Sequence, residues 1–193
     1  MIFVIDTSSA MSAVALLEPS GRTVYEDVAE SGPTFDLPSR YRALGDGPAL
    51  TRVAVATGPG SFTGLRVGVS FGLGLAIGLQ IPIVPLSTLA VQAARSQGPA
   101  LAVSEAGRGR VYHLAPGGIA GLAEPADVPR DWPAVGWLRA STRAVLEAAG
   151  VHMKADEELR GFGAAAAILL ESAREVAYGS LKLEYMQSFS ARR

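Results

Sequence analysis

The sequence predicts an α/β protein built on a mixed β-sheet. Three β-favouring runs joined by turn residues open the chain, and short turns of this kind connect antiparallel strands. A fourth, fully apolar run then leads through a glycine-rich turn into a long uncharged helix and a fifth apolar run, which together make a right-handed parallel crossover. This layout is typical of the ribonuclease-H-like, actin-like ATPase (ASKHA) fold. The five expected strands are residues 2–5, 13–17, 23–28, 53–56 and 81–84.

Local signals justify the elements between and after these strands. The run Asp6-Thr7-Ser8-Ser9 has turn chemistry and closes the first hairpin. A short helix is expected at 35–44, with Pro38 inside it. Ser87 is expected to cap a helix that continues to about Ser96, and residues 101–103 are expected to extend the same sheet.

The character of the chain changes after Glu105, where glycine and proline break it into short extended pieces. We therefore expect two small lobes: an actin-like N-terminal lobe, residues 1–104, that carries the long uncharged helix, and a smaller C-terminal lobe, residues 105–193. Within the second lobe the pattern predicts helices at 141–149 and 163–178 and a last strand at 181–186.

Composition excludes several classes of function. Charged residues make up only 18% of the 193 residues, below the ~25% of typical domains, which indicates a surface covered in a complex. A net charge of −1 gives the chain no means of its own to neutralise nucleic-acid phosphates. The lack of cysteine excludes disulfides and thiolate metal sites. The start, Met1 to Asp6, lacks the basic leader of a signal peptide, so a cytoplasmic protein is expected.

The run Thr57-Gly-Pro-Gly-Ser-Phe-Thr-Gly-Leu-Arg66 opens the uncharged stretch and is the most specific feature of the chain. Along the helix that this run begins, glycine or alanine recurs every fourth residue, which places small residues along one helix face. Each helical glycine costs roughly 0.5–1 kcal/mol against alanine, so the row needs a compensating contact. We expect a partner's backbone in this groove. The predicted partner interface is Gly64, Gly68, Phe71, Gly72, Leu75 and Ala76.

Two other uses of this helix are open. A second helix of the same chain could fill the groove, which is how many internal small-residue faces are used. The helix could also span a membrane, but it ends before Pro82 and Pro85, and its unbroken apolar part is shorter than the ~20 residues that a span requires. We therefore expect no membrane segment.

Two turns are candidates for contact with a nucleotide or phosphate. The first follows the first strand; the second precedes the N-terminus of the uncharged helix, where free amides favour anions. Structural roles are the alternative: short polar side chains satisfy backbone donors in turns, and Ser61 or Thr63 can cap the helix. No lysine follows the glycines, so the run is not a Walker motif. The candidate residues are Asp6, Thr7, Ser8, Gly58, Gly60, Ser61, Thr63 and Arg66.

No catalytic or metal-binding residue is predicted. His113 and His152 are isolated, and neither belongs to a spacing that places two histidines on one helical turn. No serine, histidine and acid occur in a recognisable order.

Three segments, residues 4–8, 53–68 and 81–89, together with Gly109-Arg110-Val111-Tyr112, resemble the TsaB family, also called YeaZ. The resemblance covers roughly residues 1–112. It implies an actin-like fold and a non-catalytic subunit that binds and activates the paralogous metalloenzyme TsaD. Together with the ATPase TsaE, such a complex adds threonylcarbamoyl to the adenosine beside the anticodon in tRNAs that read codons starting with A.

The resemblance also implies that tRNA is contacted only through the complex, that the TsaD-binding face forms homodimers when the chain is alone, and that no cofactor is bound by this chain itself, with ATP or ADP at a shared interface left open. The sequence departs from the family in its short helix around Pro38, in Glu105-Ala106-Gly107-Arg108, and in Tyr185-Met186-Gln187 near its end. The alternatives are a stand-alone actin-like-fold ATPase or peptidase, or a homodimeric scaffold.

Overall fold

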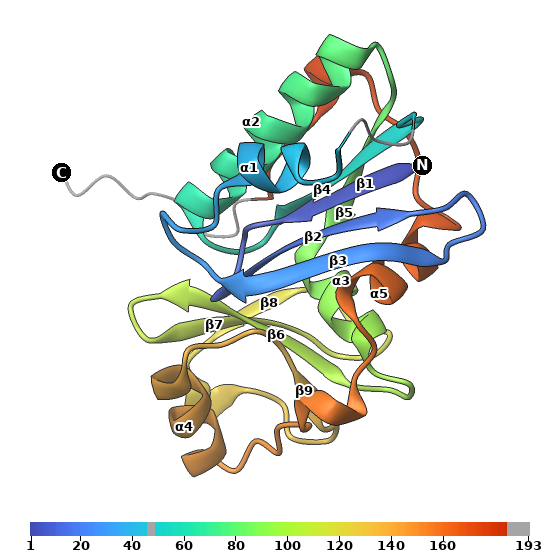
Figure 1. Ribbon diagram of the computed structural model, residues 1–193. Helices are drawn as coiled ribbons and strands as arrows, with labels where there is room; N and C mark the ends of the chain where they lie inside the picture. Colours follow the sequence, from blue (N-terminus) through green and yellow to red (C-terminus); the bar gives the residue numbers. More distant parts are fainter. Residues whose placement is uncertain (46–48, 185–193) are drawn as a thin grey trace, which may run out of the picture.

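The computed structural model describes residues 1–45 and 49–184, which form two mixed sheets with helices packed around them (Figure 1). The first sheet has the strand order β3-β2-β1-β4-β5. Strand β1 pairs antiparallel with β2 and parallel with β4, and β4 pairs parallel with β5. The predicted mixed sheet is therefore confirmed. Its strands are β1 (Ile2–Asp6), β2 (Met11–Leu17), β3 (Thr23–Glu30), β4 (Arg52–Gly58) and β5 (Ile83–Ser87).

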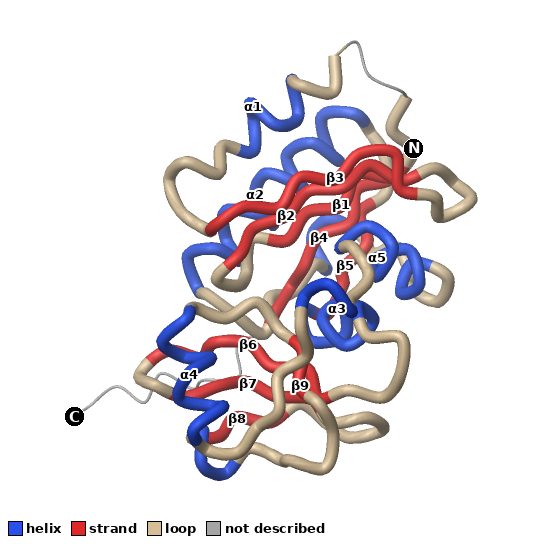
Figure 2. The backbone as a smooth tube through the Cα atoms, turned by 60° about the horizontal axis from the view of Figure 1, so that its bottom comes forward, coloured by secondary structure: helices blue, strands red, loops and turns tan. Residues whose placement is uncertain are grey.

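The second sheet lies beside the first and has the order β8-β7-β6-β9 (Figure 2). Its strands are β6 (Leu101–Gly107), β7 (Arg110–Leu114), β8 (Gly121–Ala123) and β9 (Ala134–Val135). The expectation that residues 101–103 extend the first sheet is wrong, because β6 pairs with β7 and β9 instead. The predicted division between residues 104 and 105 falls inside β6 and so does not separate the two sheets.

Five α-helices complete the described fold: α1 (Leu37–Arg42), α2 (Phe62–Leu79), α3 (Thr88–Arg95), α4 (Ala140–Ala148) and α5 (Phe162–Leu170). Helices α1 and α2 lie over one face of the first sheet, and α3 and α5 lie over the other (Figure 1). Along β1, Phe3 and Ile5 belong to the core beneath α2, whereas Val4 belongs to the core beneath α5. A strand buried on both faces has no polar positions, which explains the unbroken apolar run.

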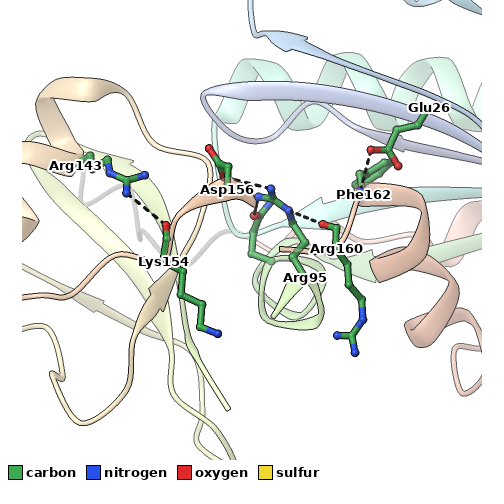
Figure 3. Close-up of polar contacts among 8 residues, drawn as sticks. Glu26, Arg95, Arg143, Lys154, Asp156, Arg160 and Phe162 are labelled. Carbon is green, nitrogen blue, oxygen red and sulfur yellow. Dashed lines mark hydrogen bonds and ion pairs between the residues drawn. The ribbon is translucent and has the colours of Figure 1, made fainter. Parts of the chain in front are cut away.

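We call the first sheet with α1, α2, α3 and α5 the first lobe, and the second sheet with α4 the second lobe. The chain returns to the first lobe at α5, because the Glu26 carboxylate on β3 accepts hydrogen bonds from the amides of Phe162 (3.1 Å) and Gly163 (2.6 Å) (Figure 3). Just before α5, the Arg95 guanidinium on α3 bonds Asp156 at 3.4 Å and the Arg160 carbonyl at 3.4 Å (Figure 3).

The last described segment runs along β5 and the end of α2. Val176 donates a backbone hydrogen bond to Ile83 at 3.0 Å, and the Tyr178 hydroxyl donates to the carbonyls of Ala76 (3.2 Å) and Ile81 (2.8 Å). Helix α5 ends at Leu170, earlier than predicted, and Val176 bridges to Ile83 of β5. No strand forms at 181–184, and the rest of the predicted strand lies outside the described residues.

Candidate functional site

The predicted docking groove on α2 faces the chain's own sheet. A Cβ on Gly64 would overlap the Thr7 carbonyl oxygen, and one on Gly72 would overlap the Val55 side chain. Gly68 is equally close to the Thr7 hydroxyl, and Ala76 is fully buried. The prediction that Gly64, Gly68, Gly72 and Ala76 offer an open groove to a partner is therefore wrong. The same chain fills the groove, as one alternative held, but with strands and a turn instead of a helix.

Phe71 and Leu75, also predicted at the interface, flank this buried row and are half-buried. The Phe71 ring meets the Tyr41 ring of α1 edge-on, with centroids 6.3 Å apart. Tyr41 in turn packs edge-on against Phe3 of β1 at 5.6 Å. Short as it is, α1 therefore fixes the side of α2 next to the sheet and leaves the opposite side of the helix open.

The open side of α2 carries a second row of small residues, Ser70, Gly74 and Gly78, again four residues apart. A Cβ on Gly74 or Gly78 would meet no atom within 4 Å. Val67 and Ile77, each 50% exposed, lie on the same side. Of the eight large hydrophobic side chains that are exposed among the described residues, four belong to α2. We call Val67, Ser70, Gly74, Ile77 and Gly78 the outer face of α2.

Within the described residues, α2 is long and apolar enough to cross a membrane when judged by length and composition alone. Its contacts identify it instead as a helix of the α/β core: the inner glycine row lies against β1 and β4, too close for any side chain to intervene.

The turn after β1 uses its polar side chains internally. Asp6 is buried, and its Oδ1 accepts hydrogen bonds from the Ser8 amide (2.8 Å) and the Ser8 hydroxyl (2.6 Å). The Ser8 hydroxyl also lies 2.9 Å from that of Thr88, and the Thr7 hydroxyl donates to the Gly64 carbonyl at 2.7 Å. These contacts support the structural role for all three candidate residues of this turn.

The glycine-rich turn packs directly on the turn after β1. The Ser61 amide donates to the Ser8 carbonyl at 2.7 Å, and a Cβ on Gly60 would overlap that same carbonyl oxygen. The Ser61 hydroxyl accepts from the Gly64 amide at 3.3 Å, which confirms the predicted helix cap. Gly58 has a φ of +116°, a conformation that other residues rarely adopt. The glycines are therefore required for this close contact.

A cleft of about 1150 Å³ separates the two lobes. It brings together five of the candidate phosphate-contacting residues, Thr7, Ser8, Gly60, Ser61 and Thr63. The other three do not line the cleft. Asp6 is buried at the end of β1, and Gly58 lies at the end of β4, before the glycine-rich turn. The exposed Arg66 stacks on the Phe62 ring at 3.8 Å.

The charged groups that line the cleft are mostly acidic. Among the described residues they are Glu30, Asp36, Glu105 and one cation, Arg139, which is already paired with Glu105 at 2.9 Å. Such a lining repels phosphate, so the arrangement does not support a phosphate site. Sequence reasoning missed the loop after β3 and the residues before α4, because only the fold places them opposite the glycine-rich turn. The described residues contain no group of three or more metal-ligating side chains.

The comparisons with known proteins extend this picture. The TsaD family, described as tRNA N6-adenosine threonylcarbamoyltransferase, matches residues 46–127. The protein named tRNA threonylcarbamoyladenosine biosynthesis protein TsaB from Haemophilus influenzae is 37% identical over 97 residues, which are 48% of this chain and 41% of that protein. The protein of the same name from Bacillus subtilis is 34% identical over 122 residues, which are 58% of this chain and 52% of that protein. The chain spans about half the length of these curated relatives.

The structure titled YeaZ from Pseudomonas aeruginosa superposes with a TM-score of 0.71 at 22% identity, covering 96% of this chain and 99% of that one. Two mixed sheets, helices on both faces of the first and a cleft between the lobes define a protein of the ribonuclease-H-like, actin-like class, as predicted. The sequence matches and this fold make the chain similar to proteins of the TsaB (YeaZ) family.

The two glycine rows predict opposite effects of the same substitution. Gly72→Leu should lower the free energy of unfolding by about 3 kcal/mol or more, because the new side chain has to displace Val55 or the sheet. Gly74→Leu, the matched control, should raise it by roughly 0.5 kcal/mol, because it replaces an exposed helical glycine. Urea unfolding of both variants measures the difference, and similar effects would contradict the assignment of the inner row.

Burial raises the pKa of the Asp6 carboxyl above its ordinary value of 3.8, although the hydrogen bonds from Ser8 partly oppose the shift. The folded state therefore holds this proton more tightly than the unfolded chain. The contribution of Asp6 to stability is complete below about pH 3.8 and is lost as the pH rises through the raised pKa. Asp6→Asn should thus gain stability relative to the unmodified chain with rising pH. Denaturation at a series of pH values tests this; a constant difference would refute it.

Proposed function

We propose that this chain is a non-catalytic subunit in the threonylcarbamoyl modification of tRNA, and that it binds and activates a TsaD-like enzyme through the outer face of α2. The names of its relatives support the pathway. The match to the TsaD family supports a common origin with the enzyme that it would bind. The observation that carries the proposal is the pair of exposed glycines, Gly74 and Gly78, within a long helix.

These two glycines have no use within the described part of the chain. Each costs roughly 0.5–1 kcal/mol of helix stability against alanine, and no contact in the described fold offsets that cost. The inner row shows what such glycines are for, since there they let backbone and side chains approach α2 closely. A partner helix laid along Ser70, Gly74 and Gly78 would use the outer row in the same way.

The outer face is also suited to burial. It has no charged residue between Arg66 and the end of the helix, and Val67 and Ile77 provide apolar surface. Apolar surface removed from water stabilises a complex by about 25 cal/mol per Å² before the costs of association. An 18-residue helix supplies part of the roughly 800 Å² that each partner of a stable complex buries, so neighbouring residues of α1 are expected to contribute.

The proposal has further parts. A TsaE-like ATPase would join the complex, and tRNA would be contacted only through it. Alone, the chain would form a homodimer through the same outer face, because that surface would otherwise remain in water. We propose a cytoplasmic location, in keeping with this partnership. The chain would bind no nucleotide by itself, and any ATP or ADP would lie at an interface shared with the partner.

Ile77→Glu tests the docking surface. An unpaired carboxylate buried in the interface should weaken binding to a TsaD-like partner at least about 30-fold, or about 2 kcal/mol. The fold should survive, because Ile77 is half exposed. Calorimetric titration with the purified partner measures the loss.

Val145→Glu on α4 is the matched control, since Val145 is 53% exposed and lies on the second lobe. It should bind the partner normally. If both variants bind equally well, the outer face of α2 is not the docking surface. Light scattering of the chain alone should show Ile77→Glu shifted from dimer to monomer; an unchanged dimer would refute the shared face.

Titration of magnesium and ATP into the isolated chain should release no binding heat, because three of the four described charged residues that line the cleft are acidic. The reason is repulsion between these carboxylates and the phosphates. Micromolar binding with turnover would instead favour a stand-alone ATPase.

A further inference from the structure

The interlobe cleft has the chemistry of a groove for a basic, aromatic peptide. Its walls carry apolar side chains, among them Phe35, Leu37 and Leu138, next to the carboxylates of Glu30 and Asp36. The only lining cation among the described residues, Arg139, is held by Glu105. An occupant that satisfies both features must bring positive charge together with large hydrophobic groups.

One hydroxyl near the cleft is buried without a partner among the described residues. Ser9 lines the cleft and is only 6% exposed, yet its Oγ has no hydrogen-bond partner among the described residues. The Ser9 carbonyl accepts from the Ser31 hydroxyl at 2.7 Å, which holds this part of the wall in place.

The described chain ends beside this cleft. The Glu184 amide donates to the Thr57 carbonyl at 2.8 Å, and the Glu184 carbonyl lies against Gly58. Gly60 and Ser61, which are two and three residues beyond Gly58, already line the cleft. Whatever follows Glu184 therefore starts close to the cleft wall.

The nine residues that follow, Tyr-Met-Gln-Ser-Phe-Ser-Ala-Arg-Arg (185–193), have the matching composition. They include two arginines and no acid, and Tyr185, Met186 and Phe189 provide large apolar groups. Nine extended residues reach about 30 Å. We propose that segment 185–193 binds in the interlobe cleft of its own chain, with its arginines facing the carboxylates of Glu30 and Asp36. This inference does not depend on the proposed TsaD-like partner.

The natural absence of cysteine makes a direct test possible in the full chain. Ser190→Cys carries a nitroxide spin label, and the broadening of amide NMR signals reports which residues lie near it. Signals of residues 30–33 and 105–107 should lose most of their intensity. They should recover it at molar salt and in the Arg192→Glu/Arg193→Glu variant, because charge pairing is screened or reversed.

Glu30→Lys should release the segment in the same way, and combining it with the two arginine reversals should restore part of the broadening. Glu171→Lys, an exposed change outside the cleft, should leave the broadening intact. Broadening confined to other surfaces, or insensitive to salt and charge reversal, would overturn the proposal. The proposal would also be overturned if the broadening occurred only in a mixture of spin-labelled chain with isotope-enriched chain that carries no spin label. The occupant of the cleft would then belong to a second copy.

Discussion

The close contact between the glycine-rich turn and the turn after β1 is the constraint on which the rest of the first lobe depends. Backbone meets backbone there: the Ser61 amide bonds the Ser8 carbonyl, and Gly60 and Gly64 leave no room for a side chain above Ser8 and Thr7. The Thr7 hydroxyl completes the contact through the Gly64 carbonyl. Because these bonds fix the start of α2, they also fix which side of the helix covers the sheet and which side faces outward.

Two rows of small residues on one helix thus have different physical explanations. In the inner row, Gly68 and Gly72 let α2 approach β1 and β4 more closely than any side chain would permit, so the cost of glycine is offset within the chain. In the outer row, Gly74 and Gly78 meet nothing in the described fold. The contrast is informative because both rows lie on the same helix and differ only in direction. An unexplained glycine indicates an interaction more clearly than an unexplained leucine, since exposed leucines are common.

What the sequence could predict was local. The strands of the first sheet follow from apolar runs and turn residues, and the Ser61 and Ser87 caps follow from residue type and position. The four-residue spacing predicted correctly that α2 has a close contact, but it could not say with what, because both rows have the same spacing. The second sheet was missed since Leu101 to Val103 are as apolar as any central strand, and only pairing with β7 and β9 separates them from the first sheet.

The cleft was beyond prediction for the same reason. Its walls come from residues more than a hundred positions apart, such as Ser9 and Leu138, and no spacing relates them. Once the fold has assembled it, however, its lining bears on whether the chain holds a nucleotide. In an actin-like protein the turn after β1 could hold a nucleotide, but here Asp6 is buried and bonded to Ser8, and the remaining charges of the cleft are mainly carboxylates. The polar groups of this turn are bonded within the chain, which is why function has to be argued from the residues and not from the fold.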